Sequence, residues 1–79
     1  MDKKVTVLLN DITKAKEFNN EASTYDECDI DLVRGRYVID AKSIMGIFSL
    51  DLSKPVDVVI HSDNEEEINR FIEAMKKFA

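Results

Sequence analysis

Residues 28–40 read CDIDLVRGRYVID, and this stretch predicts a β-hairpin. Within it, residues 28–32 alternate strictly between apolar and acidic side chains, which is typical of a strand with one buried face and one solvent-exposed face. Arg34 and Gly35 form the turn, because glycine adopts a positive φ at little cost. Residues 36–40 then return as the partner strand, so the middle of the chain holds an antiparallel pair.

Strands and helices are also predicted on both sides of the hairpin. Residues 4–9 and residues 56–61 each alternate well enough to predict a further strand. The side chains of the later strand that point inward are Val56, Val58 and Ile60. Asn10 and Asp11 are helix-cap residues, and an amphipathic helix of about 13 residues follows them. Its apolar positions are Ile12, Ala15, Phe18, Ala22 and Tyr25.

Two more helices are expected in the second half of the chain. Ser43 is a good cap for a short helix of about two turns, which exposes some apolar side chains. The apolar residues that share one face of this helix are Ile44, Ile47 and Phe48. The last helix is capped at Asp63 or Asn64, with glutamates at its positive end and lysines at its negative end. Its apolar stripe is formed by Ile68, Phe71, Ile72, Met75 and Phe78.

The element order β-α-β-β-α-β-α predicts an α+β fold. Hairpins and short connections favour a mostly antiparallel four-stranded sheet with helices over one face, which is a two-layer sandwich. A chain of 79 residues has enough apolar side chains for one core. Residues 1–79 are therefore expected to form a single domain.

Composition and charge exclude several classes of function. The formal net charge is −5, which argues against binding to nucleic acid and against docking on an anionic membrane. No window approaches the roughly 18 apolar residues of a membrane span, and no signal peptide is recognisable, so a cytoplasmic location is expected. The single cysteine can form neither an internal disulfide nor a zinc cluster. No metal and no cofactor are expected.

Most of the reactive side chains have an ordinary structural interpretation. His61 is the only histidine, and we expect it to be half-exposed on the sheet face opposite Val58 and Ile60. Cys28 is expected to be a buried, inert thiol. Four aspartates could in principle gather a divalent cation, but a solvated acidic face is the favoured interpretation because no compact loop of oxygen ligands is visible. These are Asp29, Asp31, Asp57 and Asp63.

Asp11 and Ser43 each stand at a helix start, where capping is the simplest role. For Ser43 the alternative is a regulatory phosphate, which would face free backbone N–H groups at the helix start. Such a phosphate would place about two negative charges beside the apolar residues Ile44, Met45 and Phe48. A partner that binds these residues would then sense the modification.

The segment from Lys42 to Leu50, KSIMGIFSL, resembles the regulatory-serine segment of the HPr family, which reads much like KSIMGVMSL. These proteins are the small phosphocarriers of the bacterial phosphoenolpyruvate:sugar phosphotransferase system. Residues 22–26, Gly35 and residues 73–77 add to the similarity, which spans nearly the whole chain. The resemblance implies an open-faced sandwich with strand order 1-4-2-3.

The family signature at the start of the first helix, GIHARPA, is replaced here. Residues 10–16 in this region read NDITKAK, and counting back from Tyr25 places Asp11 at the position of the phosphorylated histidine. Thr13 stands at the position of the phosphate-stabilising arginine, and Lys14 at that of the proline. His61 lies in the last strand and cannot take over. The resemblance therefore implies a protein outside the usual relay from enzyme I to the sugar-specific enzyme IIA proteins.

We interpret the chain as a regulatory protein rather than an enzyme, switched by phosphorylation of Ser43 by an HPr kinase. Its expected partners are a catabolite-control transcription regulator or proteins of the transport system. The family analogy implies one contact surface at the start of the first helix and along the short helix. The residues expected to bind the partner are Asp11, Lys42, Ile44, Met45, Ile47 and Phe48. The exposed apolar side chains are compatible with a monomer or a weak dimer.

Two alternative functions remain open. The chain could still take part in phosphoryl transfer, with Asp11 as an acyl-phosphate acceptor. A carboxylate at this position could also imitate a permanently phosphorylated carrier, with one negative charge instead of two. The other alternative is an interaction module that binds partners through Ile44, Met45 and Phe48 without any phosphate chemistry.

Overall fold

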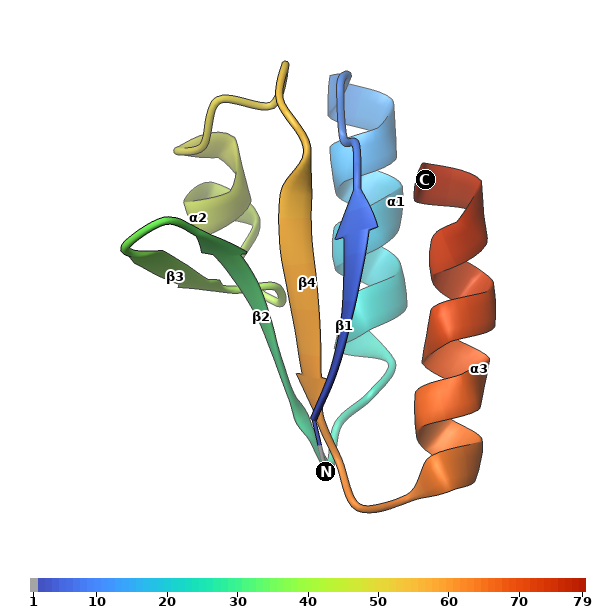
Figure 1. Ribbon diagram of the computed structural model, residues 1–79. Coiled ribbons are helices and arrows are strands. Elements are labelled where there is room, and N and C mark those ends of the chain that lie inside the picture. Colours follow the sequence, from blue (N-terminus) through green and yellow to red (C-terminus); the bar gives the residue numbers. More distant parts are fainter. Residues whose placement is uncertain (1) are drawn as a thin grey trace.

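The computed structural model describes residues 2–79, which form one antiparallel sheet with helices over one face (Figure 1). The four strands are β1 (Asp2–Val7), β2 (Asp29–Arg34), β3 (Tyr37–Asp40) and β4 (Val56–His61). They lie in the order β1-β4-β2-β3, which confirms the expected order 1-4-2-3. β1 and β2 both pair with β4, so the first and last strands are neighbours. Gly35 makes the turn between β2 and β3 with a φ of 57°.

Two long helices cover one face of the sheet, and the opposite face is open (Figure 1). They are α1 (Ile12–Ser23) and α3 (Glu65–Met75), and a 3₁₀ turn, η1 (Lys76–Phe78), ends the chain. The short helix α2 (Ile44–Phe48) packs against both α1 and β3. Each helix starts at a residue predicted to cap it, because the side chains of Asp11, Ser43 and Asn64 accept first-turn N–H groups.

The core lies between the sheet and the helices. Val56, Val58 and Ile60 of β4 point into it, as predicted, and all three are buried. Two edge-to-face aromatic pairs join the first helical segment to the last one. Their ring centroids lie 5.4 Å apart for Tyr25 and Phe71, and 5.9 Å apart for Phe18 and Phe78. Most of the apolar stripe predicted for each helix is buried here, but Ile12 is exposed.

The predicted bounds differ from the observed ones at several elements. In the hairpin, Arg34 is the last residue of β2 rather than part of the turn, and Arg36 lies in the turn rather than in β3. β1 ends at Val7, because the Leu8 amide donates to the Phe78 carbonyl at 2.7 Å instead of to β4. Leu9 nevertheless continues the apolar alternation and is buried. The expected two-turn helix is shorter, with five residues. It ends where both the amide and the hydroxyl of Ser49 donate to the Gly46 carbonyl.

Candidate functional site

Asp11 caps the N-terminus of α1. Its backbone is extended, with φ −148° and ψ 164°, and its Oδ1 atom accepts a hydrogen bond of 2.8 Å from the Lys14 amide. Its carbonyl accepts the Ala15 amide at 3.0 Å, which starts the helix. The carboxylate is exposed and stands at the positive end of the helix dipole, where a negative charge is favourable. This site can therefore hold one fixed negative charge at the helix start.

Ser43 occupies the corresponding place before α2. Its Oγ atom accepts a bond of 3.3 Å from the Gly46 amide, and its carbonyl accepts the Ile47 amide at 3.0 Å. The residue is exposed, so another protein can reach the hydroxyl oxygen. The Asn19 side chain of α1 donates to the Ala41 carbonyl at 3.3 Å, just before this cap. The entry to α2 is therefore fixed against the middle of α1.

Exposed apolar side chains lie on the two helices that these caps start. The exposed fraction is 62% for Ile12, directly after Asp11, and 77% for Met45 in α2. Phe48, at the end of α2, is 39% exposed, and Ile44 is half-buried. The two helices that carry these residues pack against each other. We call Ile12, Ile44, Met45 and Phe48 the apolar patch.

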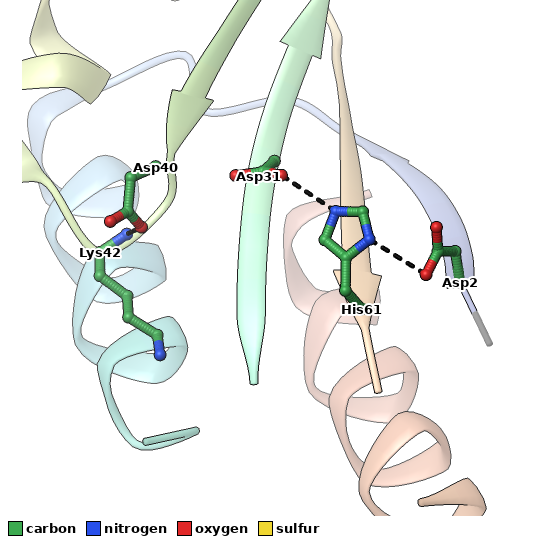
Figure 2. Close-up of polar contacts among 5 residues, drawn as sticks. All are labelled: Asp2, Asp31, Asp40, Lys42 and His61. Atoms are coloured by element: carbon green, nitrogen blue, oxygen red, sulfur yellow. Dashed lines mark hydrogen bonds and ion pairs between the residues drawn. The ribbon is translucent and has the colours of Figure 1, made fainter. Parts of the chain in front are cut away.

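Two residues of the predicted partner surface have other roles. The prediction for Ile47 is wrong, because this side chain is fully buried and packs in the core, where no partner can reach it. The Lys42 ammonium donates to the carbonyls of Tyr25 and Cys28, at 2.6 Å and 2.8 Å. Its amide donates to Asp40, as Figure 2 shows. The charge of Lys42 thus ties the turn after α1 to the segment before α2.

His61 lies at the far end of the sheet from Asp11. β4 begins with Val56 opposite Val7 of β1, near the start of α1, and it ends with His61 opposite Asp2 (Figure 1). The ring is half-exposed, on the open face of the sheet, as predicted. Its two carboxylate partners were not predicted. The Nδ1 atom lies 3.0 Å from Asp2, and the Nε2 atom lies 2.9 Å from Asp31 (Figure 2).

The remaining reactive side chains take part in the fold. Cys28 is buried, and burial raises the pKa of its thiol, with a further rise from the Glu67 carboxyl group. Asp57 accepts a bond of 2.8 Å from the Thr6 hydroxyl, and Asp31 faces His61. Over residues 2–79, no three acidic, histidine or cysteine side chains gather in a way that could hold a metal ion. The same residues contain no helix long and apolar enough to cross a membrane.

A family model described as the PTS HPr component phosphorylation site matches residues 11–79, which is most of the chain. The chain belongs to the HPr family. HPr proteins carry phosphoryl groups between other proteins of the phosphotransferase system and are not enzymes themselves. Asp11, the cap of α1, is the first residue that the family model covers. No curated protein gave a significant match.

Two solved HPr structures resemble this one along nearly their whole length. The phosphocarrier protein HPr from Bacillus anthracis str. Ames is 28% identical, with a TM-score of 0.70 and 96% of each chain covered. HPr-C-His from Thermoanaerobacter tengcongensis is also 28% identical, with a TM-score of 0.67. That similarity covers 94% of this chain and 91% of the other. The HPr fold is therefore kept while most residues differ.

The exposure of one member of the apolar patch was not predicted from the sequence. Ile12 follows the cap of α1 and fits the apolar spacing of that helix, so the pattern placed it on the buried face. It is exposed instead, and the buried residues of α1 begin only at Ala15. An isoleucine directly after a cap residue is the only signal in the sequence that could have indicated this.

Proposed function

We propose that this HPr-family protein is a regulatory interaction protein, switched by phosphorylation of Ser43, and not a carrier of phosphohistidine. The main support is the position of the only histidine. His61 lies at the end of the sheet opposite the start of α1, with a carboxylate at each ring nitrogen. At the start of α1 stands Asp11, whose carboxylate is already used to cap the helix. No phosphohistidine can form there.

The surroundings of Ser43 support the switch. Its hydroxyl is exposed, and Met45 and Phe48 of the apolar patch follow within the same short helix. A kinase would transfer the γ-phosphoryl group of ATP to Oγ, and the hydroxyl proton would leave. The phosphate adds about two negative charges beside apolar side chains, which changes what a partner can bind there. A transcription regulator of the catabolite-control type, or a transport-system protein, would read this change together with Asp11.

Phosphorylation by an HPr kinase with ATP tests the switch. We expect one phosphate in the intact protein, lost in Ser43→Ala and retained in Ser49→Ala, which removes a second exposed hydroxyl from the same segment. Because Ser43→Ala also removes a helix cap worth about 1 kcal/mol, its folding must be verified by circular dichroism. An unmodified protein, beside an ordinary HPr that becomes labelled, would exclude the switch.

Incubation with enzyme I and phosphoenolpyruvate tests the loss of the carrier reaction. We expect no label on this protein, whereas an ordinary HPr receives an acid-labile phosphoryl group on histidine. Base-labile label that disappears in Asp11→Asn would instead favour Asp11 as an acyl-phosphate acceptor. Asparagine caps a helix about as well as aspartate does, so this variant leaves the start of α1 intact.

Binding measurements with the phosphorylated protein test the apolar patch. We expect Met45→Ala to weaken the complex with the partner, because it removes an exposed side chain beside the phosphate. Tyr37→Ala is the matched control, since Tyr37 is 70% exposed but lies on β3, outside the patch. Binding that depends on Met45 but ignores Ser43→Ala would support a phosphate-independent interaction module.

A further inference from the structure

His61 lies on the open face of the sheet, between the two strands that pair with β4. In the strand register it stands opposite Asp2 of β1 on one side and Asp29 of β2 on the other. The imidazole ring reaches Asp2 with one nitrogen and Asp31, two residues further along β2, with the other (Figure 2). One side chain therefore spans three strands at this end of the sheet.

The geometry of these contacts favours a protonated ring. Both nitrogen–oxygen distances, 3.0 Å to Asp2 and 2.9 Å to Asp31, are those of hydrogen bonds. An ionised carboxylate only accepts hydrogen bonds, so each ring nitrogen must donate. A neutral imidazole carries a single N–H group, and its other nitrogen would turn a lone pair toward a carboxylate oxygen. Only the imidazolium satisfies both contacts.

We propose that His61 is a pH-dependent clasp: its imidazolium ties β1 and β2 to β4, and loss of one proton to solvent releases the start of β1. The Asp2 contact is the one that breaks, because its side chain is 61% exposed and stands at the start of an edge strand. The Asp31 side chain is 29% exposed and belongs to an inner strand, so the neutral ring keeps its single donor there.

The charged groups around the ring are mainly acidic. Lys4, two residues after Asp2 in β1, is a cation on the open face, and it lies 4.0 Å from Asp57. Asp63 and Glu27 line the same shallow depression as His61, and Asp40 of β3 stands opposite Asp31. The acidic groups that lie around His61 on β1, β2 and the adjoining loops are Asp2, Asp29, Asp31, Glu27 and Asp63.

These surroundings set the pH range of the clasp. The hydrogen bond to Asp2 raises the pKa of His61 above its ordinary value of 6.5, burial lowers it, and Asp31 raises it further, with a net rise. A folded-state pKa above that of the unfolded chain means that protonation stabilises the fold. The stabilisation is complete below about pH 6.5 and is lost as the pH rises through the folded-state pKa.

An NMR titration tests the clasp directly, because the chain has one histidine and one set of imidazole signals. We expect a pKa above 6.5 for His61 in the native protein, and a lower pKa in both Asp2→Asn and Asp31→Asn. Asp57→Asn is the control, since it removes the same charge from the open face but not from the ring. It should lower the pKa of His61 by less than either of the other two variants.

Amide hydrogen exchange tests the release of β1. After correction for the intrinsic rate, the amides of residues 3–5 should lose protection as the pH passes the measured pKa, while those of residues 58–60 keep theirs. In His61→Gln this step should disappear. The proposal is overturned by a native pKa at or below 6.5, by an equal decrease in Asp57→Asn, or by protection of β1 that does not change across the titration.

Discussion

Gly46 of α2 lies so close to Ile39 of β3 that a Cβ atom at position 46 would stand 2.6 Å from the Ile39 Cγ2 atom. Real Cβ atoms do not approach another carbon this closely, so only glycine lets α2 rest on β3. Isoleucine is branched at Cβ and has little freedom at χ1, and it therefore cannot move its methyl group away cheaply. This contact holds the segment between Ser43 and Phe48 against the sheet.

Gly46→Ala should therefore destabilise the protein. Overpacking of this kind costs about 1–3 kcal/mol. Alanine recovers up to about 1 kcal/mol through its better helix propensity. We expect a net loss of about 1 kcal/mol in the free energy of unfolding, measured by urea denaturation. In an Ile39→Ala background the same substitution should be neutral or stabilising, and an equal loss in both backgrounds would contradict the contact.

The same contact explains what sequence patterns could and could not predict about α2. Ser43 was recognisable as a cap from its residue type and place, and so was Asp11. Which face of a five-residue helix is buried depends on the strand below it, and β3 approaches at Gly46. The sequence pattern could not reveal this, and the family analogy placed Ile47 on the partner surface although the side chain is buried.

Strand alternation predicted the faces of the sheet well but not the polar pairs across it. The inward side chains of β4 and the exposed face of His61 followed from the period of two. The partners of His61 depend on the strand order, which brings Asp2 and Asp31 to either side of β4 although they are far apart in the chain. Likewise, the role of Lys42 depends on where the turn after α1 lies.

A comparison of two substitutions of Asp11 should separate the effect of its charge from its role as the cap of α1. We expect Asp11→Ala to lower the free energy of unfolding by about 1 kcal/mol, because the Lys14 amide loses its acceptor. Asp11→Asn should cost clearly less, since its amide oxygen can accept the same bond. Thermal or urea unfolding measures both. Glu17→Ala, an exposed change further along α1, is the control, and a loss as large as that of Asp11→Ala would contradict the capping role.

Lysine should not be able to replace Arg34 without a loss of stability. Its guanidinium group donates to the carbonyls of Asp51, Lys54 and Pro55, at 2.8 Å, 2.7 Å and 3.1 Å, and so fixes the loop from α2 to β4. A lysine ammonium has no planar fork of donors and cannot reproduce this arrangement. We expect Arg34→Lys to lower stability by about 1 kcal/mol and to speed amide exchange in residues 51–55.

The matched control for this loop is Arg36→Lys. Arg36 is exposed in the hairpin turn, and its replacement should leave both stability and exchange unchanged. If Arg34→Lys leaves the exchange of residues 51–55 at the rate of the parent protein, the loop does not depend on the guanidinium group.

Cys28 should react slowly with thiol reagents in the native protein. The side chain is buried, and burial together with the Glu67 carboxyl group raises the pKa of the thiol, so less of the reactive thiolate is present at neutral pH. We expect 5,5′-dithiobis(2-nitrobenzoate) to label Cys28 many-fold more slowly than the exposed thiol introduced by Ser49→Cys. In urea both thiols should react at similar rates. Equal rates in the folded protein would mean that the turn between α1 and β2 opens readily, despite the two carbonyls that Lys42 binds there.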